Sequence, residues 1–130
     1  MYGLIIKKKW LDKILSGEKT IEVRGSNTKH VGERIFLLES GTHLVRGTCI
    51  IMNTFSMSCS DWCKEAAHHC VNLTYKELTK KYQTPYAWQL TDVKDLSTNE
   101  FYYDHPKGAV IWVKDVKLHD CSVNKNEEKI

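Results

Sequence analysis

The chain has 130 residues, a formal net charge of +3 and 42% hydrophobic residues. This length suits one domain with its own core, and the mildly basic charge permits a nucleic-acid partner without requiring one. No apolar run approaches the roughly 20 residues of a membrane span, and the odd number of cysteines without a secretory signal indicates reduced thiols. We therefore expect a monomeric intracellular protein, cytoplasmic or nuclear, with no membrane association.

The first half of the chain predicts several strands and one helix. The helical spacing of apolar residues over 9–15, followed by Gly17, predicts a helix that ends at the glycine. Strands are expected over residues 1–7, 20–24, 34–39 and 44–54. Gly47, inside the last of these, predicts a bulge or bend. Consecutive strands with tight turns indicate a curled antiparallel sheet, and hence a small barrel.

The second half begins with helices and returns to strands. Helices are predicted over residues 61–71 and 74–82, the second opened by a capping box from Thr74 to Glu77. After them we expect a strand over 86–96, an aromatic loop over 99–107 and a closing strand over 108–118. The pattern as a whole predicts an α+β fold, a small β-barrel of about five to six strands with flanking helices.

Three charged groups come together where the first helix gives way to the strand over residues 20–24. In that strand Thr20, Glu22 and Arg24 share one face, and the aliphatic side chains between them share the other. Lys19, at the turn before the strand, is free to point into the same space. These groups can engage each other or one small ligand. The alternative is a solvated strand face with an ordinary exposed ion pair.

Cysteine and histidine concentrate in the predicted helices, at Cys59, Cys63, His68, His69 and Cys70. The three cysteines fall on one helical stripe and could seed a zinc site, but the spacing lacks the knuckle of a zinc ribbon. We favour a core face lined by thiols, and we expect no metal and no cofactor. A cysteine–histidine nucleophile is not favoured, because neighbouring positions on a helix point in different directions.

Three stretches together resemble one family. Residues 17–24, Gly-Glu-Lys-Thr-Ile-Glu-Val-Arg, resemble the Gly-x-Lys-x-x-Glu-x-Arg signature of ASCH domains, within the PUA-like superfamily of small barrels. Residues 84–90 and 106–112, each with a tryptophan, resemble the paired strands that end such domains. The resemblance covers residues 2–115. It implies a PUA-like barrel in one domain over residues 1–118, and we expect the polar tail over 119–130 to be disordered.

The resemblance implies a cleft that binds RNA or other nucleic acid, as PUA domains are thought to do. The residues expected to bind are Lys19, Thr20, Glu22 and Arg24 in the cleft, and Trp88 and Lys107 at its rim. Cationic side chains hold phosphate, a carboxylate accepts from an exocyclic amine, and an aromatic ring stacks on a base. Trp112, with aliphatic neighbours in sequence, is expected to be buried. We predict recognition of a nucleotide or a single-stranded RNA or DNA segment.

Two alternatives remain open. Some ASCH proteins are small hydrolases that remove the acetyl group from acetylated cytidine, using a signature lysine, a threonine in the following strand and a glutamate. Lys19 matches the lysine, but Glu22 occupies the threonine position, and Thr20 lies two residues earlier on the same face. Lys19 beside Glu22 could instead activate a water as a general base. The third possibility is a protein-interaction adaptor that binds its partner through the helices over residues 61–82.

Overall fold

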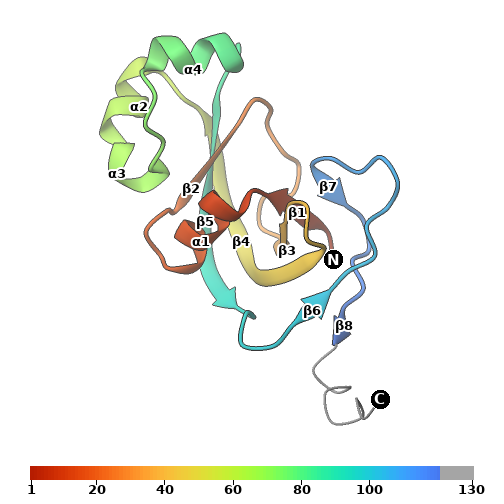
Figure 1. Cartoon of the computed structure of the whole chain (residues 1–130). Helices are drawn as coiled ribbons and strands as arrows, with labels where there is room; N and C mark the ends of the chain where they lie inside the picture. Colours follow the sequence, from red (N-terminus) through yellow and green to blue (C-terminus); the bar gives the residue numbers. More distant parts are fainter. Residues whose placement is uncertain (121–130) are drawn as a thin grey trace, which may run out of the picture.

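The computed structural model describes residues 1–120 and shows a mixed sheet, curled into a half-barrel, with helices packed beside it (Figure 1). Six strands follow one another in the spatial order β2-β5-β4-β3-β1-β7, and β6 and β8 extend the sheet from β4. The elements are, in chain order, β1 (Gly3–Ile6), α1 (Lys8–Leu15), β2 (Ile21–Arg24), β3 (Arg34–Glu39), β4 (Leu44–Ser56), α2 (Cys59–Lys64), α3 (Ala66–His69), α4 (Tyr75–Lys81), β5 (Tyr86–Asp95), β6 (Phe101–Tyr102), β7 (Trp112–Val113) and β8 (His119–Asp120). The predicted α+β barrel is confirmed.

Strand β1 lies between β3 and β7, one strand in from the edge of the sheet. Leu4 and Ile6 belong to the main core cluster, whereas Ile5 belongs to a second cluster on the other face, so this predicted strand is buried on both faces. Its pairing with β3 is parallel, and its pairing with β7 is antiparallel. The expectation of a wholly antiparallel sheet is therefore wrong. Helix α1 and strand β2 separate β1 from β3 in sequence and supply the crossover that a parallel pair needs.

Helix α1 packs Leu11 and Ile14 into the main core cluster and ends where the sequence predicts. Gly17 takes φ = +85°, a conformation that favours glycine, and the next turn directs the chain into β2. The bulge predicted in β4 is also confirmed. The pairing of β4 with β3 shifts register next to Gly47, where a side chain would lie 2.5 Å from the carbonyl oxygen of Lys94.

The helical insertion between β4 and β5 differs from its prediction. The helix expected over residues 61–71 breaks at Glu65 and ends at Cys70, which takes φ = +61°. Trp62 is the residue of α2 that enters the core, whereas Cys59 and Cys63 are exposed. The core face lined by thiols is therefore wrong, because α2 turns Trp62 towards the core and leaves Cys59 and Cys63 on its exposed side. The capping box that opens α4 is confirmed.

The C-terminal part of the chain forms a shorter strand than the sequence predicts. Of the strand expected over residues 108–118, only Trp112 and Val113 form β7, because left-handed turns at Gly108 and Asp115 redirect the chain on both sides. Trp112 is half-buried and packs against the main core cluster. The first two residues of the expected tail form β8, and its remainder lies outside the described residues. No helix within residues 1–120 combines the length and apolarity needed to cross a membrane.

Candidate functional site

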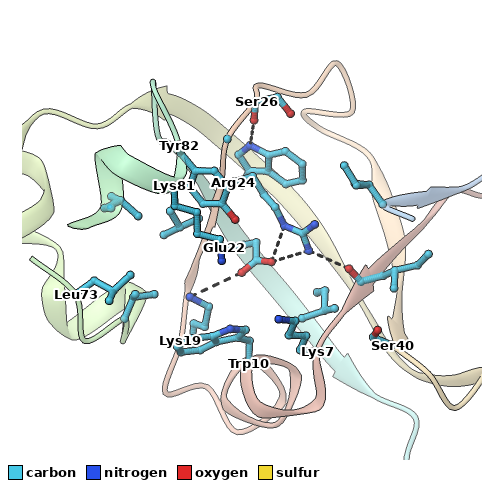
Figure 2. A pocket seen from close by; sticks show the side chains of 18 of the residues that line it. Lys7, Trp10, Lys19, Glu22, Arg24, Ser26, Ser40, Leu73, Lys81 and Tyr82 are labelled. Carbon is cyan, nitrogen blue, oxygen red and sulfur yellow. Dashed lines mark hydrogen bonds and ion pairs between the residues drawn. The ribbon is translucent and has the colours of Figure 1, made fainter. Parts of the chain in front are cut away.

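A cavity of about 550 Å³ opens on the side of the half-barrel where β2 and β1 are not paired with each other (Figure 2). Strands β1 and β2 contribute to its wall, together with α1, α4, the segment between α3 and α4, and the segment before β7. Its volume lies within the roughly 300–1,000 Å³ that is usual for small-molecule sites. The helical insertion between β4 and β5 thus completes the wall of the cavity.

Glu22 is at the centre of this cavity, and only 4% of its surface is exposed. Its Oε2 accepts hydrogen bonds from Arg24, whose Nε and Nη2 lie 2.9 and 2.8 Å away. Its Oε1 lies 3.8 Å from Lys19 Nζ, which is longer than a hydrogen bond. One carboxylate oxygen is therefore held firmly by the fold, and the other keeps acceptor capacity for a ligand.

Lys19 is buried beside Glu22 with 1% of its surface exposed. Its ammonium group donates to the carbonyl oxygen of His69 at 2.5 Å and lies 4.9 Å from the centre of the Trp10 ring. Burial disfavours the charged ammonium and lowers the pKa of Lys19, while the charge of Glu22 partly opposes this shift. A second hydrogen bond, from the backbone N–H of Thr20 to the carbonyl oxygen of His68, also joins the start of β2 to the end of α3.

Arg24 bridges the two strands that are not paired. Its Nη2 donates to the carbonyl oxygen of Ile5 at 3.0 Å, while the backbone N–H of Ile5 donates to Ile111. The guanidinium also lies 5.8 Å from the centre of the Trp88 ring. A side chain thus takes the place of strand pairing between β2 and β1, and the cavity is left open around it.

The mouth of the cavity carries two further cations, Lys7 and Lys81. Both are exposed, both line the cavity, and Figure 2 shows their side chains directed into it. Among the described residues that line the cavity, four cationic side chains accompany the single carboxylate of Glu22. An excess of positive charge in a partly enclosed site attracts anionic ligands.

The structure brings together four of the six predicted binding residues. Lys19, Glu22, Arg24 and Trp88 line the cavity, whereas Thr20 and Lys107 are exposed and take no part in its wall. Trp88 does not lie at a rim. It is 1% exposed, pairs in register with Glu22 across β5 and β2, and donates from Nε1 to the carbonyl oxygen of Ser26.

Sequence reasoning missed four of the residues that complete the cavity: Lys7, Trp10, Lys81 and Tyr82. Trp10 was visible only as part of an apolar helical stripe, and nothing in the local sequence distinguishes Lys81 from the other lysines of α4. Within residues 1–120 no group of three or more His, Cys, Asp or Glu residues is placed to hold a metal ion.

Comparisons with known proteins agree with this architecture. The ASCH domain model matches residues 4–101. Crystal structures of ASCH from Zymomonas mobilis and of two mutant forms of it share the fold, each with a TM-score of 0.59 and 16% sequence identity. The alignments each cover 72% of this chain, and they cover 68% of the ASCH chain and 69% and 70% of the two mutant chains. No curated protein matches the sequence significantly. Because the family model matches well over half of the chain, from β1 to the start of β6 and including the helical insertion, the chain belongs to the ASCH domain family.

Proposed function

We propose that this ASCH domain binds a nucleotide, either free or within a single-stranded RNA or DNA segment, in the cavity over Glu22. The observation that carries the proposal is the Glu22 carboxylate, which is 4% exposed and has one oxygen fixed by Arg24 and the other 3.8 Å from Lys19. Nucleobases present exocyclic amines that donate to such an oxygen. A buried acceptor selects strongly for ligands that satisfy it, since leaving it unpaired costs binding energy.

The cations at the mouth suit the phosphate of the same ligand. Lys7 and Lys81 are exposed, and neither forms an ion pair within residues 1–120. A lysine binds phosphate as a compact point charge and does not need the fixed geometry of an arginine. With the base over Glu22, the sugar and phosphate would extend towards these two lysines.

Two aromatic side chains give the cavity planar surfaces. Trp10 and Tyr82 are half-buried, and in Figure 2 they lie below and above Glu22. Stacking of a base on an aromatic side chain is worth about 1–3 kcal/mol. Single-stranded segments expose their bases for such contacts, whereas a duplex does not, and this favours a single-stranded ligand.

Titration against short single-stranded RNA, single-stranded DNA and duplex DNA at two salt concentrations tests this proposal. We expect the single strands to bind more tightly than the duplex, and affinity to fall as salt rises. Lys81→Gln should weaken binding and reduce the slope of log K against log salt by about 0.7, the value for one lost phosphate contact on a single strand. Lys94→Gln is the matched control, because Lys94 is exposed and lies outside the cavity. Equal binding by the two variants, or no binding by the wild type, would reject the proposal.

A second candidate function follows from the lowered pKa of Lys19 next to Glu22. A lysine that loses its proton more readily can act as a general base. Lys19 would take a proton from water, the water oxygen would attack the acyl carbon of an acylated nucleoside amine, and the carbon–nitrogen bond would break as the amine regains the proton. Hydrolysis of acetylated cytidine that is lost in Lys19→Met, under conditions where urea unfolding shows this variant to be folded, but retained in Lys94→Gln would support this activity. The absence of turnover by the wild type would reject it.

A further inference from the structure

A second cavity of about 300 Å³ adjoins the first. Ile5, Ser40 and Val110 line both cavities, so the two share part of their wall. The second cavity is completed by residues from the turn before β4 and from the loop between β6 and β7: Gly41, His43, His105 and Ala109. The two cavities are therefore immediate neighbours around Val110.

His105 is fixed in place at the wall of the second cavity. Its Nδ1 lies 2.7 Å from the hydroxyl of Tyr103, and its Nε2 lies 2.9 Å from the carbonyl oxygen of Ala109. Since a carbonyl oxygen can only accept, Nε2 carries a proton and donates, and in the neutral ring Nδ1 accepts from the tyrosine hydroxyl. Tyr103 itself is 3% exposed and belongs to the second core cluster. The ring of His105 is thus held from both of its nitrogen atoms.

His43 extends this aromatic surface into solvent. Its ring is stacked on that of His105, with centroids 5.4 Å apart and planes within 7° of parallel. The backbone of His43 is in the left-handed region, at φ = +62°, and its carbonyl accepts from the N–H of Tyr103 at 3.0 Å. Its ring nitrogens form no hydrogen bond within residues 1–120. An exposed ring, positioned in advance and with free polar edges, suits stacking and hydrogen bonding of a planar heterocycle.

We propose that the second cavity binds the base of the neighbouring nucleotide, stacked on His43, so that the domain recognises two consecutive nucleotides of a single strand. The inference rests on the proposed function, since it requires the first nucleotide in the cavity over Glu22. Val110 lines both cavities and is 76% exposed, so the sugar–phosphate link would pass over this residue from one cavity to the other. Lys107, an exposed cation on the same loop as His105, is available to the backbone of the second nucleotide.

The experiment compares ribonucleoside 5′-monophosphates with the corresponding 5′-phosphorylated dinucleotides, for each of the four bases, by calorimetric titration. We expect the preferred dinucleotide to bind roughly tenfold more tightly than its mononucleotide, because one more base stacks. His43→Asn should remove most of this difference. Asparagine is suited to the left-handed backbone at this position, so the variant removes the ring without straining the turn. His68→Asn, an exposed histidine that lines neither cavity, should retain the difference.

The outcomes separate this inference from the proposed function. Equal affinity for mononucleotide and dinucleotide in the wild type overturns the second subsite and leaves the first intact. Equal weakening of both ligands by His43→Asn overturns it as well, because His43 would then act on the first cavity. Failure of the wild type to bind either ligand overturns both proposals. A tenfold difference that disappears in His43→Asn and persists in His68→Asn supports the second subsite.

Discussion

The charged side chains on the floor of the main cavity differ in burial and in pairing from those at its mouth. On the floor, Lys19 and Glu22 are almost completely buried, and together with Arg24 they contact one another and the backbone of α3 and β1. At the mouth, Lys7 and Lys81 are exposed and form no ion pair within residues 1–120. The floor charges belong to the fold as much as to any ligand, whereas the mouth charges contribute little to the fold.

This difference predicts which substitutions should affect both stability and binding, and which should affect binding alone. A change on the floor leaves a buried charge without its partner, which costs stability as well as binding. A change at the mouth removes a solvated group, which costs binding alone. Loss of binding after a floor substitution is therefore weak support for a direct contact, and mouth substitutions test the ligand more cleanly.

The largest effect is expected for Glu22→Gln. This change removes the only carboxylate among the described residues lining the cavity and leaves Lys19 and Arg24 uncompensated. We expect the free energy of unfolding in urea to fall by about 3 kcal/mol. The control is Glu18→Gln, which removes an exposed ion pair with Lys13 and should cost less than about 0.5 kcal/mol. Similar losses in the two variants would mean that the floor is as solvated as the mouth.

A smaller loss is expected for Arg24→Lys, which keeps the positive charge. Lysine has a single head group and cannot contact both Glu22 and the carbonyl oxygen of Ile5 as the guanidinium does. We expect a loss of about 1–2 kcal/mol in the free energy of unfolding. The double variant with Glu22→Gln sharpens the test, because substitutions at two residues in direct contact do not have additive effects on the free energy of unfolding. Full additivity in urea unfolding would show that Arg24 and Glu22 act independently.

The acid response of the fold should come in part from His69, which anchors Lys19 through its carbonyl oxygen. Burial lowers the pKa of His69 from its ordinary value of 6.5. Below pH 6.5 the unfolded chain takes up a proton that the folded chain does not, so stability should fall as the pH decreases from 6.5 towards the folded pKa. Protonation would also end the hydrogen bond that Nδ1 accepts from the N–H of Val71.

Urea unfolding at pH 7.5 and at pH 5.5 measures this effect. In His69→Gln, the difference in stability between the two pH values should be smaller than in the wild type. His68→Gln, which changes an exposed side chain, should keep the wild-type difference. A difference that is unaffected by His69→Gln would show that other groups cause the acid response.

Periodicity in the sequence was sufficient to place Glu22 and Arg24 on one face, because alternation in a strand fixes which side chains share a face. It also placed Thr20 there, which is exposed outside the cavity, whereas Lys19 was assigned from its position at the turn before the strand. Periodicity was not sufficient to find the partners of Lys19 and Arg24. Lys19 donates to the carbonyl oxygen of His69, 50 positions away, and Arg24 donates to that of Ile5, 19 positions away. Every residue has a backbone carbonyl, so the residue types do not show which one is the acceptor. Trp88 shows the same limit, since the register that places it beside Glu22 depends on strand pairing rather than on local pattern.

The remaining errors arose where local pattern and tertiary context disagree. Cys59 and Cys63 follow a helical stripe, but α2 buries Trp62 instead, and the two cysteines face solvent. Val110 and Ile111 fit the pattern of a buried strand, yet they are 76% and 43% exposed at the mouth of the cavity. A sequence pattern predicts burial only where the chain supplies a covering element, and within residues 1–120 no element covers Val110 and Ile111.

The smallest effect on stability is expected at Val110, which lines both cavities. Because its side chain is largely in solvent, Val110→Ser should change the free energy of unfolding by less than about 0.5 kcal/mol. A bound ligand would cover it, so the same change should weaken binding of the preferred dinucleotide roughly fivefold. Met52→Ser is the matched control, since Met52 is 55% exposed and lies outside both cavities. A loss of stability in Val110→Ser without a loss of affinity would show that this residue serves the fold, and that the mouth is not a place where the ligand replaces missing contacts.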